Sequence, residues 1–281
     1  MAPQVETSDP RAQIHDEIWE EDNRIVIGID IGTTQSGVAF TYLIKGTKPQ
    51  IHRIMQWPGQ NANLTTKVPT VVWYSNGEAV SFGAEALSPD TLEDAQENNW
   101  KLAENFKLHL HPIDMRASDI QLDPLPDGVP LSQIYSDFLG YLFRQTRAKF
   151  EDKILDGKNI WEKYMPTMEV ILAHPNGWHT REQFFLRNAA VECGVFNTPE
   201  ATIADRIRFV TEAEASVHYC IHHTNLRTEL NAGAIFPVCD AGGSTIDTTL
   251  YSITASEPVL QIKEVHASAC ERDIDVMSDM S

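Results

Sequence analysis

Basic residues are scarce in this sequence of 281 residues. Lysine and arginine together number 22 against 40 aspartates and glutamates, which leaves a formal net charge of −18 at neutral pH. Nucleic acids and anionic membranes are bound through basic surfaces, so we expect neither as a partner. A nucleotide stays open as a ligand, because backbone N–H groups and a metal ion can hold its phosphates.

Long apolar runs and paired cysteines are also missing. No segment approaches the ~20 apolar residues that cross a bilayer. The first 21 residues are acidic and polar, without the basic and apolar regions of a secretory signal. The four cysteines form no C-x-x-C pair, which argues against a zinc or redox site. Together these absences predict free thiols in a reducing compartment, and we expect a cytoplasmic protein, with the nucleus as an additional candidate location.

Strand patterns begin directly after an acidic leader at residues 1–23. Residues 25–31 form a continuous run rich in β-branched side chains, which predicts a strand buried on both faces. Further strands are predicted at 36–43, 50–56, 68–74, 79–82, 168–174, 207–211, 235–240, 246–253 and 259–266.

Helical spacing separates these strands. The predicted helices cover 91–110, 131–155, 180–193 and 212–223, and a proline-rich loop occupies 112–130. We expect Thr180 to cap its helix with Glu182 in the first turn, and Asp127 or Ser132 to cap the helix at 131–155. Strands that alternate with helices after an initial hairpin predict the α/β class, with a mixed sheet and helices on its faces.

Two loops share one chemical pattern. Residues 29–34 read I-D-I-G-T-T, and residues 239–247 read C-D-A-G-G-S-T-I-D. Each places an aspartate at the end of an apolar strand, follows it with glycine and hydroxyl residues, and returns directly into another strand. Two ordinary tight turns are the purely structural explanation.

The functional interpretation of these loops is a clamp on phosphates. Glycine has no Cβ, so backbone N–H groups can approach a phosphate closely. A carboxylate is repelled by phosphate oxygens but can hold Mg²⁺ through the metal's waters. The pair therefore predicts that ATP binds with Mg²⁺ between Asp30 and Asp240, where positioning and electrostatic stabilisation supply most of the catalysis. The P-loop and protein-kinase motifs are both missing.

Four blocks in order, at 28–36, 170–178, 208–219 and 240–247, carry a family resemblance. Their order resembles the actin-like ATPase superfamily, which has a ribonuclease H-like fold, and within it the 70-kDa heat-shock chaperone family. Sugar kinases share the first block but not the other three in this form. A carbohydrate or acid kinase is therefore the weaker alternative.

The resemblance implies a Mg²⁺–nucleotide site. The residues that it implies for catalysis are Asp30, Glu212, Asp240 and Thr245. The residues that it implies for nucleotide contact are Gly32, Thr33, Thr34, Gly242, Gly243, Ser244 and Asp247. In this scheme Asp30 and Asp240 organise the Mg²⁺ shell and Glu212 positions the attacking water. The alternative for Glu212 is an acid stabilised by the dipole at a helix start.

Several positions depart from the family pattern. Leu87 stands where the family has a lysine that supports hydrolysis, and Lys101 and Lys107 lie downstream. Ala213 replaces a usual proline, and His174 replaces a usual valine. These departures resemble the divergent eukaryotic branch of the family, and they predict slow or absent hydrolysis.

The resemblance also predicts the domain organisation. We expect the first lobe of an actin-like ATPase domain at 24–270, an inserted subdomain at about 50–165, and a non-matching tail at 271–281. On this interpretation the chain is a truncated form without the second lobe. The predicted function is an ATP-binding lobe of a chaperone-like stress-response protein, with protein clients and co-chaperones as further candidate partners. A non-enzymatic interaction module is the alternative.

Overall fold

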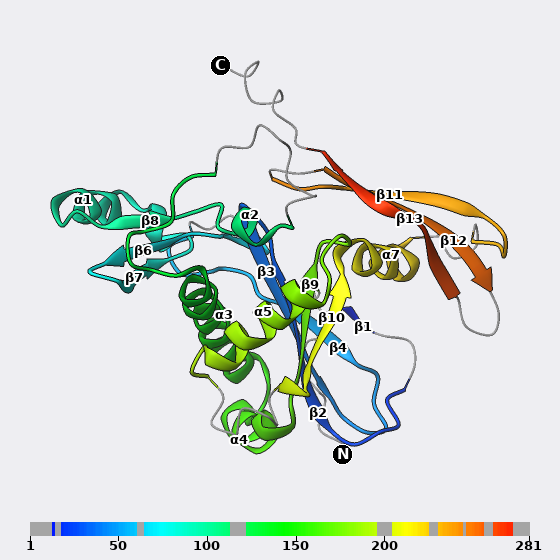
Figure 1. Ribbon diagram of the computed structural model, residues 1–281. Helices are drawn as coiled ribbons and strands as arrows, with labels where there is room; N and C mark the ends of the chain where they lie inside the picture. The colour runs from blue at the N-terminus through cyan, green and yellow to red at the C-terminus, as the bar shows by residue number, and fades with distance from the viewer. Residues whose placement is uncertain are drawn as a thin grey trace.

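The computed structural model describes residues 13–14, 18–60, 65–112, 122–195, 204–224, 230–243, 246–255 and 261–271. The strands of its largest sheet are β1 (Gln13–Ile14), β2 (Arg24–Ile31), β3 (Gln35–Leu43), β4 (Gln50–Arg53), β5 (Lys67–Pro69), β9 (Glu169–His174) and β10 (Ile207–Thr211). Their order is β1-β4-β3-β2-β9-β10, and β5 pairs with β3 outside this path. The sheet is mixed, because β2 is antiparallel to β3 and parallel to β9, which is parallel to β10 (Figure 1).

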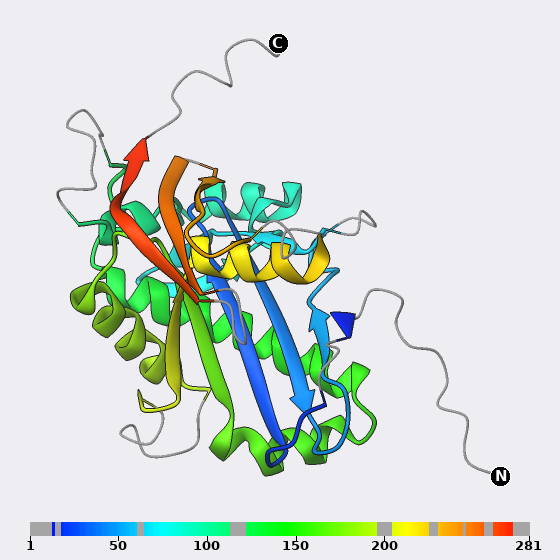
Figure 2. The same ribbon diagram turned by 90° about the vertical axis from the view of Figure 1, so that its right-hand side faces the viewer.

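Helices α3 (Leu131–Lys153) and α5 (Thr180–Glu192) cover one face of this sheet (Figures 1 and 2). Alternate side chains of β2, from Ile25 to Ile31, point into the core between sheet and helices. Phe138 and Leu142, four residues apart on α3, are fully buried in the same core. Apolar side chains at every second position of the strand therefore pack against apolar side chains four residues apart on the helix, and this contact holds the two layers together.

The opposite face of the sheet is only partly covered. Helix α7 (Glu212–His223) lies over one end of that face, in front of the sheet in Figure 2. The prediction that residues 25–31 are buried on both faces is therefore wrong, because every second residue of β2 is only half-buried. None of the described helices combines the length and the apolarity needed to cross a bilayer.

A small second sheet is inserted between β5 and α3. Its strands are β6 (Val72–Ser75), β7 (Glu78–Phe82) and β8 (Lys101–Ala103), in the order β7-β6-β8. The single strand predicted at 68–74 is wrong, since it divides into β5 and β6, which join different sheets.

The predicted helix at 91–110 is also wrong in its middle. The segment divides into α1 (Pro89–Glu97), β8 and α2 (Lys107–Leu110). Asn99 and Asn105 take left-handed backbone conformations that interrupt a helix, and asparagine tolerates them better than most residues. The break matters for the site, because α2 becomes a separate helix whose residue Lys107 lines the cleft described below.

Two helix starts and one helix differ from the predictions. His179, rather than Thr180, is the N-cap of α5, and its backbone N–H donates to Glu182 at 3.0 Å. Pro130 precedes α3, which has no side-chain cap. Helix α4 (Gly157–Tyr164) was not predicted. Two short 3₁₀ turns complete these elements: η1 (Glu85–Leu87) and η3 (Met165–Thr167).

A third, antiparallel sheet stands apart from the main sheet (Figure 1). Its strands are β11 (Ile235–Ala241), β12 (Ile246–Ala255) and β13 (Gln261–Glu271). In β11 and β12, Asp240 pairs in register with Asp247. The last strand runs further than the predicted 259–266, and residues 256–260 lie outside the described part. The turn between β11 and β12 carries the second acid–glycine loop.

Candidate functional site

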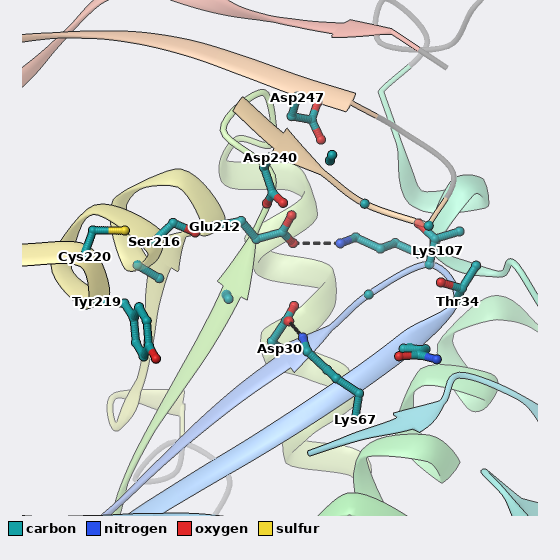
Figure 3. A pocket seen from close by; sticks show the side chains of 18 residues that line it. Asp30, Thr34, Lys67, Lys107, Glu212, Ser216, Tyr219, Cys220, Asp240 and Asp247 are labelled. Carbon is teal, nitrogen blue, oxygen red and sulfur yellow. Dashed lines mark hydrogen bonds and ion pairs between the residues drawn. The ribbon is translucent and has the colours of Figure 1, made fainter. Parts of the chain in front are cut away.

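A cleft of about 850 Å³ separates the turn after β2 from the turn after β11. Figure 3 shows Asp30 on one wall, Asp240 and Asp247 on the other, and Glu212 between them. Of the predicted site residues, the cleft is lined by Asp30, Gly32, Thr33, Thr34, Glu212, Asp240, Gly242, Gly243 and Asp247. Ser244 and Thr245 lie outside the described residues. The fold thus brings together two loops that are more than 200 residues apart in the sequence.

Glycine is needed where these loops are tightest. A Cβ at Gly32 would collide with the backbone carbonyl of Gln35, so only glycine permits this sharp return from β2 to β3. A Cβ at Gly243 would collide with the side chain of Thr34. The second contact shows that the two loops touch each other across the end of the cleft.

A buried ion pair lies at the centre of the cleft. Lys107 Nζ donates to Glu212 Oε1 at 2.7 Å, and the two side chains are 6% and 16% exposed. Lys107 also lies 5.8 Å from the centre of the Trp178 ring. Leu87, at the position where a lysine was expected, is 47% exposed and does not line the cleft. A lysine does therefore reach the site, from α2 instead of η1.

The charges of the cleft are unbalanced. Its lining holds four carboxylates, with Asp30 and Glu212 among them, against the ammonium groups of Lys67 and Lys107. At neutral pH this leaves a formal surplus of two negative charges. A surplus of that size favours the uptake of a divalent cation, or of protons, by the cleft.

Burial and the negative surplus together raise the pKa values of two acids in the cleft, and the surplus raises that of Lys107 against burial. Burial raises the pKa of Asp240, and repulsion by Asp30 and Asp247 raises it further. Burial likewise raises the pKa of Glu212, and repulsion by Asp30 and Asp240 adds to this rise, although the attraction of Lys107 opposes it. For Lys107, burial favours the neutral amine, but the attraction of Glu212 and Asp30 is stronger and raises the pKa of the ammonium group. All three shifts have the direction expected in a negative field.

A second lysine pairs with the first acid loop. Lys67 Nζ forms an ion pair with Asp30 Oδ2. Lys67 carries no local signal in the sequence, because its partner is 37 residues away and on another strand.

One face of α7 completes the lining. Glu212, Ser216, Tyr219 and Cys220 all contact the cleft, and their spacing of three and four residues places them on one side of the helix. The same spacing can be seen in the sequence. Once Glu212 is placed in the site, helical periodicity predicts that Ser216, Tyr219 and Cys220 line it as well. Among the described residues, Cys193, Cys220 and Cys239 are thiols, as predicted.

The residues present fit Mg²⁺ bound chiefly through water and phosphate. Across the described ranges, no three histidine, cysteine or acidic side chains are grouped closely enough to hold a metal by themselves. Mg²⁺ in nucleotide sites is commonly held by one or two carboxylates, several waters and the phosphates. Asp30 and Asp240 supply such carboxylates, because they face one cleft from opposite walls.

The mixed sheet with flanking helices is consistent with the lobe of an actin-like ATPase. Comparison with known proteins gives the particular relatives. Human heat shock 70 kDa protein 12B is 24% identical in a 300-residue alignment that covers 87% of this chain and 42% of that protein. Mouse and human heat shock 70 kDa protein 12A are 26% and 25% identical over 202 residues, which cover 70% of this chain and 28% of each.

These similarities support the divergent heat-shock-70-like branch that the motif resemblance predicted. The chain spans less than half the length of these relatives. No protein-family model matches it.

Proposed function

We propose that this chain binds ATP and ADP with Mg²⁺ in the cleft between its two acid–glycine loops, as the nucleotide-binding part of a divergent heat-shock-70-type protein. The observation that carries the proposal is that Asp30 and Asp240, on separate sheets, line one cavity of about 850 Å³. Two unrelated tight turns would have no reason to meet in this way.

The two walls have complementary roles in the proposal. The hydroxyls of Thr33 and Thr34 contact phosphate oxygens from the β2–β3 side, and the backbone N–H groups of Gly242 and Gly243 contact them from the β11–β12 side. Bound Mg²⁺ neutralises phosphate charge, which lets a triphosphate enter a cleft with surplus carboxylates. The sheet β11–β13 then acts as the opposing wall of the site.

The chemistry proposed for hydrolysis rests on the central ion pair. Lys107 fixes the carboxylate of Glu212 by a 2.7 Å contact, so that Glu212 can orient a water for attack on the terminal phosphate. Lys107 is itself close enough to the cleft to offset charge that develops on that phosphate. Because the family lysine is displaced onto another element, we expect slow turnover.

Calorimetry with ATP and Mg²⁺ tests binding directly. Phosphate and metal contacts alone are expected to give affinity in the high micromolar range or weaker, about −5 kcal/mol. Asp240→Asn should weaken the dependence of binding on Mg²⁺. Absence of heat at millimolar ATP, with the protein folded, would reject the proposal.

Single-turnover hydrolysis then separates two functions. If the unmodified chain forms ADP and the Glu212→Gln variant does not, the result supports an ATPase. If ATP binds but no ADP forms, the result supports a module that acts through surface contacts. Protein clients, co-chaperones and a cytoplasmic location are part of the same proposal, and their support is the resemblance to the heat-shock proteins.

A further inference from the structure

Three neighbouring strands place an acid, a glycine and a lysine in one row. In the antiparallel pair of β2 and β3, Asp30 is opposite Gly37. In the antiparallel pair of β3 and β5, Gly37 is opposite Lys67. Residues opposite each other in a sheet project their side chains to the same face. Asp30 and Lys67 therefore point to the same side, with only a glycine between them.

The missing side chain of Gly37 lets the two charges meet. A Cβ at Gly37 would lie 3.1 Å from Lys67 Cδ and 3.4 Å from Cε, so the lysine stem runs directly over the glycine. Its ammonium group ends on Asp30. The backbone of Lys67 is fixed as well, because its carbonyl accepts from Gln60 Nε2 at 2.8 Å. This contact is built into the sheet and does not depend on a loop.

The two walls of the cleft differ in this respect. On the β2 wall, Asp30 already has a cation in contact. On the β11 wall, Asp240 forms no ion pair within the described part of the chain, and it is repelled by Asp30 and Asp247. Both Asp30 and Lys67 line the cleft and keep more than a third of their side-chain surface exposed. An incoming divalent cation therefore meets a neutralised carboxylate on one side and an open one on the other.

We propose that Lys67 is a built-in counter-ion that occupies the cation position at Asp30 and sets how much divalent metal the cleft requires. The proposal deepens the function proposed above and rests on it where nucleotide is concerned. An ammonium group and a metal ion compete for one carboxylate, so metal binding displaces Lys67. The freed lysine stays in the cleft on its flexible four-carbon stem, within reach of a phosphate oxygen of bound nucleotide.

Binding of Mn²⁺ alone, followed by electron paramagnetic resonance, tests this competition without nucleotide. Lys67→Met should bind Mn²⁺ about tenfold more tightly than the unmodified chain, because the competing cation is gone. Lys101→Met, at an exposed position of β8, is the matched control and should leave Mn²⁺ binding unchanged. Adding Asp30→Asn to Lys67→Met should remove the gain. Equal Mn²⁺ affinity of Lys67→Met and the unmodified chain would overturn the proposal.

A second variant tests the geometry without changing any charge. Gly37→Val pushes the lysine stem aside, and the atoms nearest to its Cβ position belong to the flexible end of Lys67. It should strengthen Mn²⁺ binding in the same direction as Lys67→Met, and weaker or unchanged binding would count against the row of three residues. If ATP binds to none of the proteins, the proposed nucleotide function fails, while the Mn²⁺ comparison still decides the role of Lys67. If ATP binds, Lys67→Met should reach half-saturation with less Mg²⁺.

Discussion

Lys107 and Glu212 are 105 residues apart in the sequence, and a 2.7 Å ion pair joins their side chains in the cleft. Lys107 belongs to the four-residue helix α2, and Glu212 is the first residue of α7. The start of α7 already carries a second acid, Glu214, so the pair also relieves a concentration of negative charge near the site. This contact connects the inserted segment to the strand–helix unit that borders the cleft.

Removing the lysine should destabilise the fold strongly. Lys107→Met leaves the buried carboxylate of Glu212 without its partner, which costs about 3–5 kcal/mol in comparable buried pairs. Urea denaturation followed by circular dichroism measures the loss. The double variant with Glu212→Gln should recover part of it, because no unpaired charge stays buried. A single variant as stable as the double one would show that the unpaired carboxylate of Glu212 costs nothing.

The first loop should tolerate no side chain at its glycine. Gly32→Ala is expected to lower the free energy of unfolding by about 1–3 kcal/mol, since its Cβ meets the carbonyl of Gln35. Gly28→Ala, on the strand β2 that leads into this turn, is the matched control, because nothing lies within 4 Å of the added Cβ. Thermal denaturation of the two variants compares them. Equal melting temperatures would contradict the tight turn.

Asp240→Asn should stabilise the protein in the absence of ligand. The pKa of Asp240 is raised in the folded state, so the folded protein holds that proton more tightly than the unfolded chain. Stability then falls as the pH rises from the ordinary aspartate range through the raised pKa, and the asparagine variant escapes this fall. At neutral pH we expect a gain of about 0.5–1 kcal/mol, modest because Asp240 is only half-buried.

Denaturation at several pH values without Mg²⁺ measures this difference. The advantage of Asp240→Asn should shrink as the pH drops below the ordinary aspartate pKa, where both states carry the proton. Added Mg²⁺ should reverse the order at neutral pH, since only the aspartate attracts the cation. A gain that is independent of pH would show that charge repulsion is not its cause.

Bound nucleotide should protect one thiol selectively. Cys220 lines the cleft on α7, whereas Cys239 is exposed on β11 outside the lining. Alkylation by N-ethylmaleimide, followed by peptide mass spectrometry, should slow several-fold at Cys220 when ATP and Mg²⁺ are present, because the ligand blocks access. The rate at Cys239 serves as the internal control. Equal protection at both thiols would indicate a general change of the fold instead.

Local sequence patterns were enough for the elements that frame the site. The apolar run at 25–31, the helix at 131–155 and the strand–helix unit from Ile207 to His223 were predicted within a few residues. Between residues 68 and 110 the predicted strand at 79–82 was confirmed as β7, but tertiary pairing divided the strand at 68–74 and left-handed asparagines at 99 and 105 divided a helix. Periodicity of apolar residues carries no signal for either event.

The sequence by itself determined the two acid–glycine turns, because their residue types fix a tight return from a buried strand. Their shared pattern also predicted that the turns face each other, but the sequence could not determine that Lys107 and Lys67 supply the positive charges of the cleft. The partners of these two ion pairs are separated by 105 and by 37 positions in the sequence. Whether they meet depends on which strands and helices become neighbours. That choice follows from burying the whole core at once, and only the tertiary structure records it.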